Sequence, residues 1–293
     1  MIIKPKHYDK FKCIASACPD TCCAGWEIDV DREASEYYAS LTGDNGVFVR
    51  ERLIDTNEGQ KLCLEGERCR FLRRDNLCEL ILRLGEDALC DICREHPRFY
   101  TEYGNVTAAG MGLCCPAACE LWLSEPCEFI SDADSYEADA DENAEAERLL
   151  WLIDRIVKGN GTLGERFAEI IGGDDENAGL FSELRKLYSS IEVLDVHFPE
   201  RFSEQPTVTD DKRFINLAAY FIFRYYFELG EELTIKFTAA SLIMIAAMGG
   251  DVCISAKDYS KEVEYDTDNL DVIYGFLSDC RGLAALCRRL LAV

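Results

Sequence analysis

The chain has only three histidines, at positions 7, 96 and 197, and no apolar run long enough to cross a bilayer. Its longest apolar stretch, residues 237–248, is interrupted by Thr238 and Ser241. A membrane-spanning helix needs roughly 20 such residues, so this stretch predicts a buried core helix instead. The N-terminus lacks the apolar segment of a secretory signal. These absences together predict a cytoplasmic protein with no transmembrane segment.

Positive charge is also scarce. The chain has 31 Lys and Arg against 55 Asp and Glu, which gives a formal net charge of −24. A nucleic-acid partner requires a basic surface, so we expect no such partner. Glycine-rich nucleotide loops and a nucleophile-elbow serine are absent as well. The C-x3-C-x2-C spacing of radical enzymes that use S-adenosylmethionine is missing, because Gly25 stands where a third cysteine would follow Cys18 and Cys22.

Cysteine, by contrast, is abundant, and 13 of the 16 cysteines lie in the first 127 residues. Cytoplasmic thiols stay reduced, so a disulfide framework is disfavoured and binding of a metal or cluster is favoured. The cysteines fall into four groups: Cys13, Cys18, Cys22 and Cys23; Cys63, Cys69 and Cys78; Cys90 and Cys93; and Cys114, Cys115, Cys119 and Cys127. Zinc and a [4Fe–4S] cluster both take four thiolates, so both remain open.

The third cysteine group has the spacing of half a metal site. Cys90 and Cys93 lie three residues apart in a predicted helix, so both thiols can project from one face. His96 nearby is a ligand, a proton carrier or simply a polar residue at the end of that helix. Arg94 and Arg98 flank the group and can compensate the charge of thiolates. Asp31 is expected to cap a helix rather than to act in acid–base chemistry.

Composition predicts a mainly α fold in three segments. We expect a cysteine-rich metal- or cluster-binding module with short strands at residues 1–127, an acidic linker at 128–147 and an α-helical domain at 148–293. No Lys or Arg occurs between Arg98 and Arg148, and ten of the residues 124–147 are acidic, which favours a solvated connection.

Apolar spacing places the individual elements. A short strand is expected around residues 26–30. Expected helices cover residues 31–41, 77–84, 86–95, 113–123, 145–157, 163–171, 180–196, 214–229, 233–248 and 269–291. In the segment 113–123 the helical turns are expected after Pro116, since proline suits the first turn of a helix. The aromatic stretch 214–229 is expected to pack in a helical core rather than to bind a cofactor.

Several spaced motifs occur in the order found in one known family. They are Cys13-x4-Cys18-Pro-Asp-Thr-Cys22-Cys23-Ala-Gly25-Trp26, then Cys69-x-Phe-Leu-x4-Leu-Cys78-Glu, then Cys90-x2-Cys93-x2-His96-Pro97-Arg98, then Cys114-Cys115-Pro116. Over residues 7–123 the chain resembles the flagellin lysine-N-methylase family. The helical C-terminal half resembles it only in the aromatic stretch 214–229.

The resemblance implies transfer of a methyl group from S-adenosylmethionine to lysine side chains of a protein substrate, with flagellin as the family's target. It also implies a [4Fe–4S] cluster, while the cysteine pattern itself leaves zinc as the alternative metal. The matched thiols, and so the candidate ligands, are Cys13, Cys18, Cys22, Cys23, Cys69, Cys78, Cys90, Cys93 and Cys115. The competing hypotheses are a zinc- or cluster-stabilised binding protein without catalysis and an electron-transfer protein. The residues that bind the methyl donor are not indicated.

Overall fold

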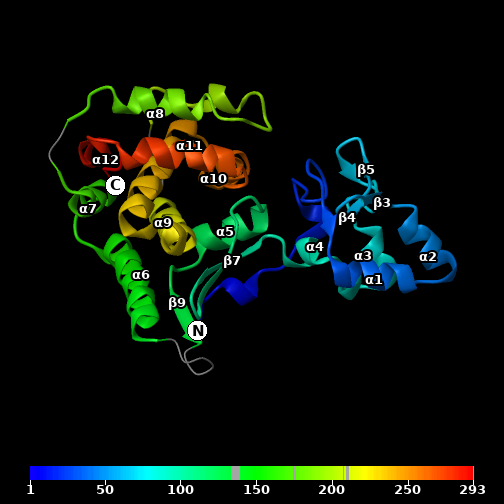
Figure 1. Cartoon of the computed structure of the whole chain (residues 1–293). Coiled ribbons are helices and arrows are strands. Elements are labelled where there is room, and N and C mark those ends of the chain that lie inside the picture. The colour runs from blue at the N-terminus through cyan, green and yellow to red at the C-terminus, as the bar shows by residue number, and fades with distance from the viewer. Residues whose placement is uncertain (133–138, 174–175, 207, 209–210, 293) are drawn as a thin grey trace. The chain divides into compact units, whose positions relative to one another are not determined.

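Two units make up the computed structural model, which describes residues 1–132, 139–173, 176–206, 208 and 211–292 (Figure 1). The smaller unit is Lys12–Phe99, and the larger unit combines Met1–Phe11 with Tyr100–Val293. In the described residues, no helix is long and apolar enough to span a membrane.

The smaller unit combines short strands with short helices. Its elements are β2 (Asp29–Val30), α1 (Arg32–Ser40), α2 (Gly43–Arg50), β3 (Leu53–Thr56), β4 (Gly59–Leu62), β5 (Leu64–Glu65), β6 (Arg68–Cys69), α3 (Glu79–Leu84), the 3-10 turn η3 (Glu86–Ala88) and α4 (Asp91–Glu95). The strands form an antiparallel sheet in the order β2-β4-β3 and a β5–β6 hairpin. Its core includes Tyr38, Val49 and Phe71, all at most 2% exposed.

Asp31 begins α1 as the sequence predicts. Its carboxylate accepts a hydrogen bond from the Ala34 backbone N–H at 2.9 Å, which satisfies a donor that the first helical turn leaves unpaired. The same carboxylate accepts the Asp91 N–H at 2.7 Å, at the first residue of α4. Inside the unit, the Tyr38 hydroxyl donates to the Ala88 carbonyl at 2.7 Å. These bonds fix α1 against the segment that carries Cys90 and Cys93.

A four-stranded sheet in the order β7-β8-β1-β9 opens the larger unit. The strands are β7 (Arg98–Tyr103), β8 (Val106–Met111), β1 (Ile2–Pro5) and β9 (Phe129–Asp132). β1 runs parallel to β8 and antiparallel to β9, with Ile3 opposite Ala108 and Ser131. Ile3, Val106 and Ala108 are fully buried, so the sheet contributes to the core of this unit.

The helices of the larger unit surround one long helix, α9 (Asp211–Met248) (Figure 1). α9 packs against α5 (Pro116–Ser124), α6 (Ala140–Lys158), α7 (Leu163–Ile171), α8 (Leu180–Tyr188), α10 (Val252–Tyr259), α11 (Thr267–Ser278) and α12 (Leu283–Leu290). Gly230 has φ 70° and ψ 175° inside α9, which is the break predicted between residues 229 and 233. Tyr220, Phe221 and Phe237 are fully buried, which confirms that these apolar stretches are core.

The two units do not coincide with the three predicted segments. Residues 1–11 and 100–127 of the predicted module belong with the C-terminal helices. Residues 133–138 of the predicted linker lie outside the described residues; its other parts form β9 and the start of α6. Asp139 and Glu142 form a capping box at the start of α6. Acidic residues at this position stabilise the helix, because the N-terminal end of a helix dipole is positive. β9 was not predicted because it pairs with β1 through backbone hydrogen bonds, which the amino-acid composition of the segment does not reveal.

Most predicted helices are confirmed, and several have other bounds than predicted. Helix 163–171 is found as predicted, and helix 113–123 begins at Pro116. Residues 86–95 form η3 and α4 rather than one helix. The helix predicted for 180–196 ends at Tyr188, and residues 269–291 divide into α11 and α12. α2, α10 and the strands other than β2 were not predicted individually. The remaining short helical turns are η1 (Tyr8–Lys10), η2 (Ala15–Ala17), η4 (Phe198–Arg201) and the π-helix η5 (Ser260–Glu264).

His7 gives the larger unit a specific dependence on pH. It is 1% exposed, its ring meets that of Trp122 edge-on at 4.8 Å, and neither ring nitrogen has a hydrogen-bond partner. Burial lowers the pKa of His7 from 6.5 to about 4, against a smaller opposing effect of Glu125. The unfolded chain therefore takes up a proton at His7 between pH 6.5 and 4 that the folded chain refuses.

Lowering the pH from 7 to 4.5 should thus reduce the free energy of unfolding by about 2–3 kcal/mol through His7 alone. His7→Phe keeps an aromatic ring beside Trp122 but cannot bind a proton. Urea unfolding of both proteins at the two pH values isolates the His7 contribution as the difference between them. Equal losses of stability in wild type and variant would contradict it.

Candidate cysteine site

Five cysteines from separate segments of the smaller unit come together around its core. They are Cys23 in the loop before β2, Cys69 in β6, Cys78 at the N-cap of α3, Cys90 at the N-cap of α4 and Cys93 within α4. We call these five residues the cysteine cluster. The Cys69 N–H donates to the Cys23 carbonyl at 2.8 Å, which holds the first two segments side by side. An antiparallel bridge between Leu72 and Cys78 places the segment that carries Cys78 beside the segment that follows Cys69.

The thiols of the cysteine cluster alter one another's pKa. The pKa of Cys69 is raised to about 11, mainly by burial, with smaller contributions from the charges of Cys23 and Cys78. Burial likewise raises the pKa of Cys78, with added effects of Cys23 and Cys90. The pKa of Cys93 is raised, chiefly by its hydrogen bond with Cys90 and then by burial. Crowded and buried thiols of this kind resist carrying several negative charges unless a cation joins them.

Nearby backbone N–H groups favour the charged form of three of these thiols. Those of Phe71 and Leu72 act to lower the pKa of Cys69, and those of Leu80 and Ile81, in the first turn of α3, act to lower the pKa of Cys78. The pKa of Cys90 is lowered mainly by the Cys93 thiol, with a smaller effect of the Cys93 backbone N–H. The pKa of Cys23 is lowered to about 7, chiefly by a hydrogen bond from Cys22. Donors of this kind stabilise thiolates and tune the sulfurs of iron–sulfur centres.

Four of the nine candidate ligands are not members of the cysteine cluster. Cys22 adjoins it through Cys23, and its carbonyl accepts the Trp26 indole N–H at 2.8 Å. Cys13 and Cys18 flank the turn Ala15–Ala17, and Cys13 is exposed. Cys115 caps α5 and so belongs to the larger unit. Their ligand roles stay predictions.

The cysteine cluster is not arranged as a site for one ion. Within the described ranges of the chain, no group of three or more His, Cys, Asp or Glu side chains has the geometry to hold a metal ion. A single zinc ion needs four sulfurs, each about 2.3 Å from it. Ligands of an iron–sulfur cluster bind separate iron atoms and are spread more widely. The predicted metal or cluster site therefore stays a prediction, and the five thiols of the cysteine cluster are among its nine candidate donors.

Sequence reasoning missed a buried ionic network in the larger unit. The side chain of Glu264, at the end of the π-helix, is fully buried and pairs with the Arg224 Nε at 3.1 Å. Its Oε2 atom also accepts the hydroxyls of Tyr220 at 2.8 Å and Tyr225 at 3.0 Å. Burial raises the pKa of both tyrosines, which keeps them as phenol donors. Arg224 is the single charge within the aromatic stretch 214–227, and that was the available signal.

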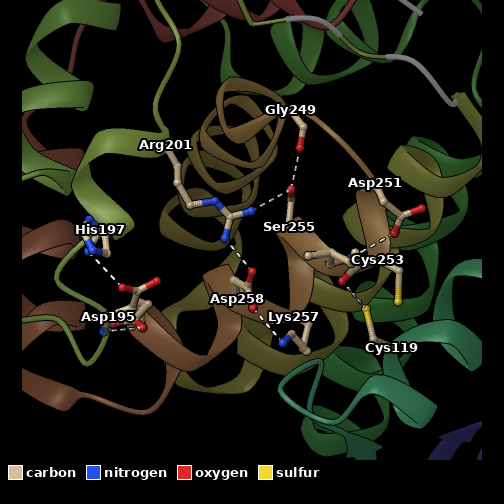
Figure 2. Close-up of polar contacts among 12 residues, drawn as sticks. Cys119, Asp195, His197, Arg201, Gly249, Asp251, Cys253, Ser255, Lys257 and Asp258 are labelled. Atoms are coloured by element: carbon tan, nitrogen blue, oxygen red, sulfur yellow. Dashed lines mark hydrogen bonds and ion pairs between the residues drawn. The ribbon is translucent and has the colours of Figure 1, made fainter. Parts of the chain in front are cut away.

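A small pocket lies at the C-terminal end of α9. It has a volume of about 190 Å³, and its lining includes Phe214, Met248 and Ser255. The Ser255 hydroxyl donates to the Gly249 carbonyl at 2.6 Å, and the Arg201–Asp258 ion pair lies beside it at 2.5 Å (Figure 2). Sites for drug-sized ligands measure about 300–1,000 Å³, so this pocket alone does not mark a donor site.

Curated proteins similar to this chain come from Salmonella. The flagellar biosynthetic protein FliU of Salmonella muenchen is 30% identical over 132 residues, which cover 43% of this chain and 78% of that protein. The lysine-N-methylases of Salmonella typhimurium strain LT2 and Salmonella choleraesuis strain SC-B67 are also 30% identical over 132 residues. The match spans only 33% of each of these two proteins. No family model and no solved structure matches the chain.

The fold and the cysteine cluster define a mainly helical, cysteine-rich protein of two units. With the FliU match covering more than two thirds of that relative, the chain belongs to the flagellin lysine-N-methylase family.

Proposed function

We propose that this chain is a protein-lysine N-methyltransferase that uses S-adenosylmethionine, carries a [4Fe–4S] cluster and modifies flagellin-type proteins. Family membership supports the activity, since two relatives are named lysine-N-methylase and a third is named a flagellar biosynthetic protein. The observation that supports the iron–sulfur cluster is that five cysteines converge around the core of the smaller unit. Backbone N–H groups also favour the thiolate forms of Cys69, Cys78 and Cys90.

Four of the five thiols of the cysteine cluster would hold the iron–sulfur group. Its thiolates come from the loop before β2, from β6 and from the starts of α3 and α4. When bound, the cluster supplies positive iron centres that offset the thiolate charges and cross-link these segments. The protein itself contributes the buried walls and the N–H donors to the sulfurs.

Methyl transfer to an amine balances without further reactants. The lone pair of the lysine nitrogen attacks the methyl carbon of the sulfonium, and the sulfur–methyl bond breaks to release a neutral thioether. The amine loses one proton. The step requires a deprotonated amine aligned with the sulfonium, so positioning is the main demand on the protein.

The activity is tested with anaerobically purified protein, labelled S-adenosylmethionine and purified flagellin. We expect label on lysine side chains, located by peptide mapping, and none when the chain is omitted. A matched control uses flagellin whose lysines have been acetylated beforehand, which blocks the acceptor nitrogen. Unlabelled lysines with full iron content would contradict the methyltransferase and favour the non-catalytic binding protein.

A further inference from the structure

Two cysteines outside the cysteine cluster face each other within the larger unit. Cys119 on α5 and Cys253 on α10 lie side by side, with their sulfurs toward one another (Figure 2). The Cys119 thiol donates to the Cys253 carbonyl at 3.5 Å, and α5 packs against α10. A hydrogen bond with the Cys253 thiol is also the main cause that raises the pKa of Cys119. Both cysteines are reduced in the structure.

The two thiols differ in access to solvent. Cys119 is 0% exposed, whereas Cys253 is partly exposed at the start of α10. A small oxidant therefore reaches Cys253 first. Once the Cys253 sulfur is oxidised, the neighbouring Cys119 thiol is in position to react with it. This division into an accessible and a resolving cysteine is the arrangement of redox-sensing pairs.

We propose that Cys253 and Cys119 form a redox pair that a hydroperoxide converts into a disulfide between α10 and α5. The terminal oxygen of the peroxide is transferred to the Cys253 sulfur, which becomes a sulfenic acid, and the rest leaves as an alcohol or water. The Cys119 sulfur then attacks the Cys253 sulfur. The S–O bond breaks, and the hydroxyl leaves as water with the Cys119 proton. Two electrons pass from the two thiols to the peroxide.

The disulfide would hold α5 and α10 together, and each of these helices adjoins another notable part of the larger unit. α5 begins at Cys115, and α10 continues directly into the π-helix that ends at Glu264. The bond closes a loop between residues 119 and 253, and cross-links over long loops restrict the unfolded chain most. Oxidation should therefore be visible as a gain in thermal stability.

The test treats the full chain with hydrogen peroxide, alkylates the remaining thiols and maps the peptides by mass spectrometry. We expect a linked peptide pair containing Cys119 and Cys253 with two hydrogens lost. The melting temperature should rise on the order of 5–10 °C and return on reduction with dithiothreitol. Alkylation of both residues after oxidation, or linkage of Cys253 to another cysteine, would overturn the proposal.

Two variants separate this disulfide from oxidation elsewhere. Cys253→Ser removes the accessible thiol at a partly exposed position and should abolish both the linked peptide and the rise in melting temperature. Cys280→Ser removes another partly exposed thiol of the same unit and should leave both intact. Oxidation within the cysteine cluster occurs equally in the two variants. A rise in melting temperature that persists in Cys253→Ser would also overturn the proposal.

Discussion

Replacing Cys93 by Ser is expected to remove most of the iron from anaerobically purified protein, from about four atoms per chain to less than about one. Cys93 lies within α4, and the charges of Cys90, Cys23 and Cys69 all act on its thiol, so it sits among the other donors of the cysteine cluster. A serine hydroxyl remains protonated near neutral pH and is a poor ligand for iron. Iron and acid-labile sulfide are measured on both proteins, together with the visible absorption spectrum.

Cys63→Ser is the matched control for this measurement. Cys63 lies in the same unit and is partly buried, but its thiol donates to the Leu64 carbonyl at 3.6 Å. This variant should retain its iron. If Cys93→Ser keeps its metal, Cys93 is not a ligand. Zinc in place of iron in the anaerobic wild type would overturn the iron–sulfur proposal and support the zinc alternative.

The same assay decides which thiols of the cysteine cluster bind. The cysteine cluster has five thiols, but a [4Fe–4S] cluster has only four ligand positions. One of the five single Ser variants should therefore keep most of its iron. Variants of Cys13, Cys18 and Cys115 test the ligands predicted from the family motif alone. If all four ligands come from the cysteine cluster, the three variants retain their iron, whereas loss of iron in one of them would add that cysteine to the ligands.

Replacing Arg224 by Met is expected to lower the free energy of unfolding by about 3–5 kcal/mol. The Glu264 side chain is fully buried and that of Arg224 is only 13% exposed, so the variant leaves a carboxylate buried without its cation. Removal of the Glu264 charge at the same time, in Arg224→Met with Glu264→Gln, should cost less than the sum of the two single changes. Urea unfolding of the three variants and the wild type gives these values.

An exposed ion pair provides the control for the buried one. Lys158 and Asp154 pair at 2.8 Å on α6, with side chains 65% and 58% exposed. Lys158→Met should change the free energy of unfolding by less than about 1 kcal/mol, because water screens this pair. If Arg224→Met costs as little as Lys158→Met, the buried network does not depend on its charges.

Local chemistry made much of the helical structure predictable. Asp31 and Pro116 mark helix starts because a capping carboxylate and a ring with fixed φ act within a few residues. Gly230 marks the break in α9 for a similarly local reason, since its φ of 70° is one that other residues rarely adopt. The β-sheet of the larger unit was not predictable in this way. β1 joins partners more than 100 residues away, and only the folded backbone shows that pairing.

The sequence by itself determined that this protein is mainly helical, rich in cysteine and related to the flagellin lysine-N-methylases, because periodicity, composition and spaced motifs are all local properties. Only the tertiary structure decided which cysteines meet. It gathered Cys23, Cys69, Cys78, Cys90 and Cys93, placed Cys115 in the other unit, and paired Cys119 with Cys253 across 134 positions of sequence. The physical reason is that contacts between thiols depend on how distant segments pack, and motif spacing carries no information about that packing.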